Sequence, residues 1–127
     1  GKAITLREGK KICILGFGPI INECIKIAEK MNATLIDMRF VKPMDEEIIE
    51  QKSKNHDLIV TIEENSIMGG AGSAVNEVLA KKNITKKLLI IGMPDQFVEH
   101  GTQEEVLKAC GLDALSIENK IVNAMRK

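Results

Sequence analysis

Two adjacent carboxylates and a run of glycines are the residues of this chain whose types and spacing could do chemistry. Glu63 and Glu64 end an apolar segment, and Gly69, Gly70 and Gly72 follow shortly after. Carboxylates at a strand end can transfer protons or hold a metal ion, and a glycine loop at a helix start can bind phosphate through its N–H groups. No lysine follows these glycines, however, and two carboxylates would repel a phosphate. Adjacent strand residues also point to opposite faces, so the two acids cannot easily share one target.

A structural role for these acids is the favoured interpretation. One of them is expected to cap the amide donors of the following helix, or to pair with Arg39. Arg39 and Lys42 lie in the segment DMRFVKPMD at residues 37–45. Arg39 could clamp a carboxylate through two parallel hydrogen bonds. An ion pair across neighbouring strand ends explains it at least as well.

A second glycine motif imitates a dinucleotide-binding fingerprint. Gly16 and Gly18 end an apolar segment, and Asp37 follows 21 positions after Gly16, where an acid could bind a ribose hydroxyl. The third glycine of the fingerprint is replaced by Ile21, which prevents close approach of helix and strand. Pro19, in the expected first helical turn, removes one amide donor. The motif therefore predicts a chain reversal in preference to nicotinamide or flavin binding.

The remaining reactive side chains give no catalytic pattern. His56 and His100 are isolated histidines in expected loops, which is a poor basis for a metal site or a triad. Ser66 and Ser73 have no base placed near them by the sequence. We therefore expect no catalytic, cofactor-binding or metal-binding residue on this chain.

The elements that position these residues alternate between strand and helix. Strands are expected at residues 3–6, 12–15, 33–40, 57–62 and 87–91. Helices are expected over residues 20–31, after an N-cap at Asp45, from the glycine loop through Leu79, from a capping box at residues 102–105 to Gly111, and from a Ser116 cap through Ala124. The turn-like residues 7–10 predict that the first two strands form an antiparallel pair. This pattern predicts one α/β domain over residues 1–127, a three-layer α/β/α sandwich with a mostly parallel five-stranded sheet and an antiparallel edge strand.

Composition narrows the possible partners and the compartment. Basic and acidic residues balance at 18 each, so no broad field would attract nucleic acid or an anionic membrane. Aromatic residues make up only 2%, which argues against base stacking. Cys13, Cys24 and Cys110 are odd in number and widely spaced, which indicates free thiols in a reducing compartment. With no apolar run of membrane-spanning length, a cytoplasmic location is expected.

Four segments resemble the 1-deoxy-D-xylulose-5-phosphate synthase family. They are DMRFVKPMD at residues 37–45, EENSIMGGAGSAVNE at 63–77, GMPDQFVEHGTQEE at 92–105 and CGLD at 110–113. A shorter form of the first two is shared with transketolases and with the β subunits of 2-oxoacid dehydrogenases. The run at residues 64–70 selects the synthase. Met44 and Met93 stand where leucine is common, and Gln96 occupies a position that varies.

The resemblance implies a large parent enzyme, of which this chain is the third, C-terminal domain. Such enzymes are homodimers of three-domain chains that use thiamine diphosphate and Mg²⁺ to condense pyruvate with D-glyceraldehyde 3-phosphate, losing CO₂. Their product feeds the non-mevalonate isoprenoid route and thiamine synthesis. The residues for cofactor, metal and catalysis belong to the N-terminal and central domains, so this chain alone is expected to be inactive. By the same resemblance the domain serves packing and dimerisation, and its contact candidates are Arg39, Lys42, Glu63, Glu64, Gly69, Gly70 and Gly72.

Two other functions remain open. A free-standing nucleotide-binding or regulatory module would use the glycine loops, and ATP or NAD would then raise its melting temperature. The C-terminal part of a 2-oxoacid dehydrogenase β subunit would instead require a tightly bound α chain.

Overall fold

A five-stranded sheet forms the centre of the molecule. The computed structural model describes residues 2–66, 70–93 and 101–127. The strands are β1 (Ile4–Arg7), β2 (Lys11–Phe17), β3 (Thr34–Asp37), β4 (His56–Ser66) and β5 (Lys87–Met93), in the spatial order β1-β3-β2-β4-β5. Every pair is parallel except β1 with β3. The predicted mostly parallel sheet with an antiparallel edge strand is confirmed.

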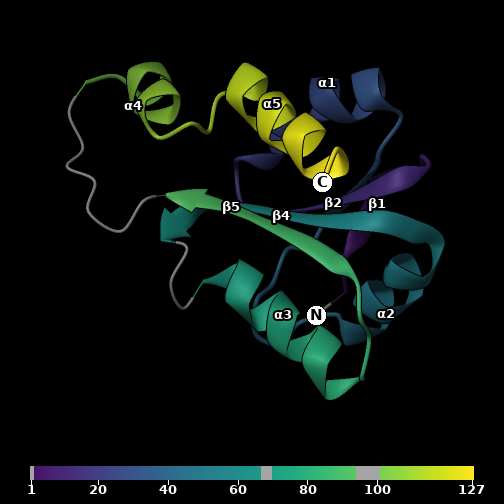
Figure 1. The fold of residues 1–127 in the computed structure, drawn as a ribbon. Coiled ribbons are helices and arrows are strands. Elements are labelled where there is room, and N and C mark those ends of the chain that lie inside the picture. The colour runs from purple at the N-terminus through teal and green to yellow at the C-terminus, as the bar shows by residue number, and fades with distance from the viewer. Residues whose placement is uncertain (1, 67–69, 94–100) are drawn as a thin grey trace.

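Helices cover both faces of this sheet and complete the predicted three layers. They are α1 (Ile21–Met31), α2 (Glu46–Asn55), α3 (Ala71–Lys81), α4 (Gln103–Ala109) and α5 (Ala114–Met125). Figure 1 shows α1, α4 and α5 above the sheet and α2 and α3 below it. Each side has its own apolar core, one with Ile14, Leu35 and Val60, the other with Leu15, Ile36 and Ile59. Consecutive strand residues thus enter opposite cores, which explains why β2 reads as a continuous apolar run.

The partner of β1 was predicted wrongly. The turn-like residues 7–10 suggested an antiparallel pair with the next strand, yet β1 pairs with β3, with Ile4 opposite Asp37. Both edges of β2 are already taken, because β3 and β4 flank it in parallel. The four parallel strands leave two open edges, on β3 and on β5, and β1 occupies the one on β3. Consequently the start of β1 lies beside the end of β3.

Most of the predicted helix ends are confirmed, and one is wrong. Asp45 caps α2 by accepting from the Ile48 amide, and Thr102 forms the capping box of α4. Gly111 follows α4 in the left-handed region at φ 73°. Ser116 is not a cap, because Asp113 caps α5 and accepts a hydrogen bond from the Ser116 amide.

Other boundaries shift by a few residues. Pro19 lies two residues ahead of α1, in a turn, whereas a place in the first helical turn was expected. The strand expected at residues 33–40 is shorter, since β3 ends at Asp37, and the strand expected at 57–62 is longer, since β4 runs from His56 to Ser66. Because β4 is longer than predicted, both glutamates of the candidate site lie on a strand.

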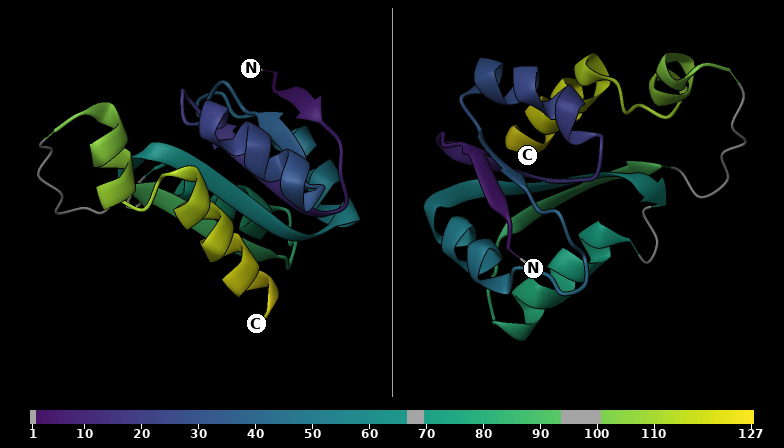
Figure 2. Two further views of the ribbon diagram at one scale, coloured as in Figure 1. Left: turned by 90° about the horizontal axis from the view of Figure 1, so that it is seen from above. Right: turned by 180° about the vertical axis from the view of Figure 1, so that it is seen from behind.

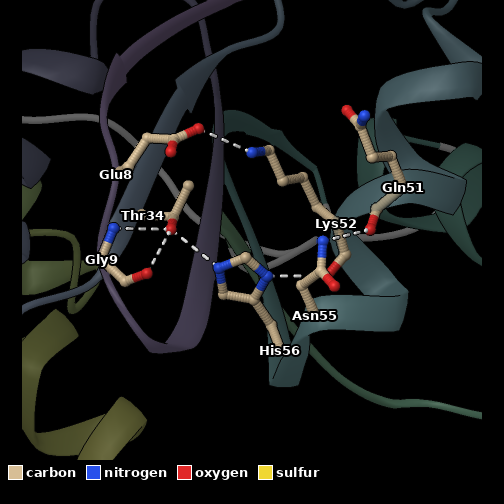
Figure 3. Close-up of polar contacts among 7 residues, drawn as sticks. All are labelled: Glu8, Gly9, Thr34, Gln51, Lys52, Asn55 and His56. Atoms are coloured by element: carbon tan, nitrogen blue, oxygen red, sulfur yellow. Dashed lines mark hydrogen bonds and ion pairs between the residues drawn. The ribbon is translucent and has the colours of Figure 1, made fainter.

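His56 is wrongly predicted as a loop residue. It is the first residue of β4 and is buried. Its ring joins three segments in Figure 3: Nδ1 lies 2.7 Å from the Lys52 carbonyl oxygen, and Nε2 lies 2.7 Å from the Thr34 hydroxyl oxygen. The same hydroxyl oxygen accepts a hydrogen bond from the Gly9 amide at 2.9 Å. Because a carbonyl only accepts, Nδ1 is the donor to Lys52, whereas the Thr34 hydroxyl, which also lies 3.3 Å from the Gly9 carbonyl oxygen, is the partner of Nε2. The network ties α2 to the β1–β2 connection, at the amino ends of β2, β3 and β4.

Thr34→Val is expected to lower the free energy of unfolding by about 2 kcal/mol. Valine keeps the shape of threonine, but it leaves the buried His56 Nε2 and the Gly9 amide without this partner. Urea unfolding of the chain measures the difference. Thr5→Val, on the exposed edge strand, is the matched control and should change stability by less than about 0.5 kcal/mol. Equal effects of the two substitutions would contradict the network's contribution.

All three cysteines are buried and none is part of a disulfide, which agrees with the prediction from their number and spacing. Burial raises the thiol pKa of Cys13 to about 12, although Lys52 opposes the shift. Burial likewise raises the thiol pKa of Cys24 to about 12, and the Glu23 carboxylate adds to it. Both thiols therefore keep their protons in the folded chain at pH values where the unfolded chain has lost them.

These raised pKa values predict alkaline destabilisation. Each thiol contributes stability that is complete below the unfolded value of 9.0 and is lost as pH rises toward about 12. The free energy of unfolding should fall by about 1.4 kcal/mol per pH unit per thiol in that window. We expect urea unfolding between pH 8 and 10.5 to show a steeper decline than for Cys13→Ala/Cys24→Ala. The lysines titrate in both proteins, and there is no tyrosine to interfere. Parallel curves for the two proteins would contradict this expectation.

Candidate functional site

The candidate residues follow the carboxyl ends of β3 and β4. Ligands of open parallel sheets usually bind at this edge, because the loops after neighbouring strands meet there. Arg39 and Lys42 follow β3, whereas Glu63 and Glu64 are the last part of β4. Gly70 and Gly72 lie at the start of α3. Gly69 lies outside the described residues.

Glu63 is a structural carboxylate that holds the start of α3. Its side chain is buried, with 3% exposed, and Oε1 accepts a hydrogen bond from the Ala71 amide at 2.7 Å. Ala71 is the first residue of α3, so the carboxylate satisfies an amide that has no partner inside the helix and also opposes the positive end of the helix dipole. The prediction that one of the two glutamates caps the following helix is confirmed. Glu64, the next residue on the strand, is only partly buried, as expected for the opposite face.

The glycines allow α3 to approach the sheet closely. Gly70 is the N-cap residue of α3, and its carbonyl oxygen accepts from the Ala74 amide at 3.2 Å. A Cβ atom at Gly72 would lie 2.5 Å from Ile90 Cγ2 and 2.8 Å from Thr61 Oγ1. No other residue type fits there without movement of the sheet side chains. Gly72 therefore has a packing role, because the space beside its backbone is occupied by Ile90 and Thr61.

Arg39 and Lys42 have exposed side chains. Arg39 adopts a left-handed backbone conformation at φ 63°, and its amide donates to Asp37 Oδ1 at 3.1 Å. Its guanidinium carbon lies 5.5 Å from the centre of the Phe40 ring. Within residues 2–66, 70–93 and 101–127, neither Arg39 nor Lys42 forms an ion pair, so the predicted pairing of Arg39 across strand ends is not seen there.

At the dinucleotide-like motif, the space beside the first glycine is occupied by a side chain of the protein. The Ile21 side chain, at the first turn of α1, occupies the space into which a Cβ atom of Gly16 would project. The sequence predicted that the dinucleotide motif is incomplete at Ile21. The structure shows the reason, because the Ile21 side chain packs against Gly16, the first glycine of the motif.

The other candidates do not form a site in the described part of the chain. His56 lies at the opposite end of β4 and makes structural hydrogen bonds. Ser73 is partly buried in the first turn of α3, and His100 lies outside the described residues. Within the described ranges, no group of three His, Cys, Asp or Glu side chains is placed to hold a metal ion. None of the described helices combines the length and apolar character needed to cross a bilayer.

Sequence reasoning missed two side chains at this edge, Phe40 and Val41. They are 42% and 37% exposed. A cavity of about 370 Å³ lies next to them, between residues 41–44 and α3. Its lining includes Val41, Lys42, Met44, Ala74 and Val78. The sequence offered one signal for Phe40, which is the scarcity of aromatic residues. A chain with only three phenylalanines makes the position of each one informative.

The topology and its carboxyl-edge loops define the class to which this domain belongs. The chain superposes on a split-gene transketolase, described as an inactive beta4 tetramer, with a TM-score of 0.90 and 29% identity over 98% of this chain and 42% of that one. Residues 1–117 match the family model of the transketolase, C-terminal domain. The chain belongs to this family. A transketolase from Campylobacter jejuni, 19% identical with a TM-score of 0.60 over 95% of this chain and 18% of that one, shares the fold.

Curated relatives are more similar in sequence. A 1-deoxy-D-xylulose-5-phosphate synthase from Photobacterium profundum is 54% identical over 95% of this chain and 20% of the relative. One from Pseudomonas fluorescens (strain Pf0-1) is 52% identical over 93% of this chain and 19% of the relative. The chain thus spans about a fifth of the length of these relatives.

Proposed function

We propose that the chain is the C-terminal domain of a 1-deoxy-D-xylulose-5-phosphate synthase. The identity of 54% over 95% of the chain to a protein of that name carries the proposal. The parent enzyme condenses pyruvate with D-glyceraldehyde 3-phosphate, with loss of CO₂, and supplies the non-mevalonate isoprenoid route. It is a cytoplasmic homodimer. Thiamine diphosphate and Mg²⁺ bind to its N-terminal and central domains, and the cofactor supplies the carbanion chemistry.

In this enzyme the present domain serves packing and dimerisation. The buried Glu63 cap and the close approach at Gly72 support this role, because both fix the position of α3 against the sheet. The proposed contacts to the neighbouring domain or subunit are Arg39, Lys42, Glu64, Gly69 and Gly70. A free nucleotide-binding module gains no support, since Ile21 fills the space beside Gly16.

The test is the activity of three purified proteins: the full-length enzyme, the same enzyme truncated ahead of Lys2, and the present chain. Each is assayed for CO₂ release and product formation from pyruvate and D-glyceraldehyde 3-phosphate, with thiamine diphosphate and Mg²⁺ added. We expect activity from the full-length enzyme only. A full-length protein without synthase activity would overturn the assignment. Undiminished activity and dimerisation of the truncated enzyme would overturn the role given to this domain.

A further inference from the structure

The loop after β3 exposes apolar and cationic side chains together. Arg39, Phe40, Val41 and Lys42, here named the β3-loop surface, are consecutive and all exposed. The chain contains three phenylalanines and no tryptophan or tyrosine. Phe17 is buried, whereas Phe40 is 42% exposed. A chain with so few aromatic side chains thus leaves one of them in contact with solvent, next to an exposed valine.

The cation of this surface is oriented and has no acidic partner in the described ranges. The Arg39 guanidinium lies over the Phe40 ring, which restricts both side chains. None of the ion pairs among the described residues includes Arg39 or Lys42. Arginine is enriched among the residues that contribute most binding energy at protein interfaces, and phenylalanine is enriched in interface cores. A complementary segment would offer an apolar side chain to Phe40 and Val41 and a carboxylate to Arg39.

The surface continues into a concave region. The cavity of about 370 Å³ between residues 41–44 and α3 begins at Val41 and Lys42 and extends to Ala74 and Val78. Its lining also includes Lys81 and Glu46, which are paired with each other at 2.8 Å. An apolar side chain that entered this cavity would meet Val41, Ala74 and Val78.

The start of the domain lies beside this surface. The Ala3 amide donates to Asp45 Oδ2 at 3.0 Å, and Ile4 lies opposite Asp37, the last residue of β3. In the right-hand view of Figure 2, the beginning of β1 lies next to the loop that leaves β3. Any polypeptide joined ahead of Lys2 enters the domain here. The relatives are about five times as long as this chain, so the proposed function implies a large polypeptide ahead of Lys2.

We infer that the β3-loop surface binds the segment that precedes β1 in the same enzyme chain. The inference rests on the proposed function, which makes the present chain the end of a longer one. The proposed function allowed contacts either to the neighbouring domain of the same chain or to the second subunit. The present inference selects the neighbouring domain of the same chain. It also adds Phe40 and Val41 to the contacts. Arg39 binds a carboxylate of the preceding segment, and Phe40 and Val41 bury an apolar side chain of it.

Photo-crosslinking of the full-length enzyme tests the occupant. A benzophenone amino acid replaces Val41 in dimers assembled from ¹⁴N and ¹⁵N subunits, and mass spectrometry identifies the linked peptides. We expect links to peptides preceding Lys2, within subunits of one isotope only, and at least a three-fold lower yield with Arg39→Glu. The same probe at Leu115, 64% exposed on α5, is the control for accidental linking. Links between isotopes, or a yield no higher than at Leu115, would overturn the inference.

A melting comparison separates contact from folding. Phe40→Ala and Arg39→Glu should leave the melting temperature of the present chain within about 1 °C, because both side chains are exposed in it. In the full-length enzyme each should lower the melting temperature of this domain by several degrees. Leu115→Ala and Arg126→Glu are matched controls and should have no effect in either protein. Equal melting temperatures of all four variants in the full-length enzyme would contradict binding of the preceding segment at the β3-loop surface. The proposed function is tested independently, because it fails on synthase activity whatever the crosslinks show.

Discussion

Glu63→Ala is expected to lower the free energy of unfolding of this chain by about 3 kcal/mol. The substitution removes a charge-assisted hydrogen bond to the Ala71 amide and leaves that buried donor without its partner. It also leaves space beside Phe17, the residue opposite Glu63 on β2. Urea unfolding followed by circular dichroism gives the difference. The start of α3 depends on this contact, because Ala71 is the first residue of the helix.

Two further variants define the origin of the effect. Glu63→Gln keeps an oxygen that can accept from Ala71 but loses the charge, so we expect a smaller loss of about 1 kcal/mol. Glu77→Ala removes an exposed carboxylate from the middle of α3 and should change stability by less than about 0.5 kcal/mol. If Glu63→Ala behaved like Glu77→Ala, the carboxylate would not be a structural cap.

The sheet could be predicted from the sequence because its strands are short apolar runs with clear boundaries. Ile12 and Ile14 enter one core, whereas Cys13 and Leu15 enter the other. A strand buried on both faces leaves little choice of residue type, and so the pattern is easy to recognise. Asp45 and Thr102 were predicted correctly for a similar reason, since a cap interacts with amides only two or three residues away.

Contacts between distant segments could not be predicted in this way. The pairing of β1 depends on which sheet edge is vacant after β2, β3 and β4 have assembled, and residues 7–10 carry no information on that. His56 was misjudged because its hydrogen-bond partner Thr34 is 22 residues away in the sequence. At the site, a capping role for one of the two glutamates followed from local spacing, whereas the choice of Glu63 required the structure. The exposure of Phe40 and Val41 depends on how the β3 loop folds over α3, which no periodicity describes.

Gly72→Val is expected to destabilise the chain by about 3 kcal/mol, despite removing a glycine from a helix. Elsewhere in a helix the loss of glycine would favour folding by up to about 1 kcal/mol. Here the first added carbon would meet Ile90 Cγ2 at 2.5 Å and Thr61 Oγ1 at 2.8 Å. Overpacking of this kind costs about 1–3 kcal/mol, and the β-branched valine adds two more carbons to the same space. Thermal and urea unfolding of the variant measure the net effect.

A double-mutant cycle shows whether the contact with Ile90 is the cause. In the Ile90→Ala background the side chain nearest to position 72 is shortened, so Gly72→Ala should cost at least about 1 kcal/mol less than in the original chain. Asn76→Ala, at an exposed position of the same helix, is the control for helix propensity and should be neutral or slightly stabilising. Equal costs of Gly72→Ala in the two backgrounds would show that α3 is not held at this distance by Ile90. The close approach of α3 to β5 would then require another cause, with Thr61 as the next contact to remove.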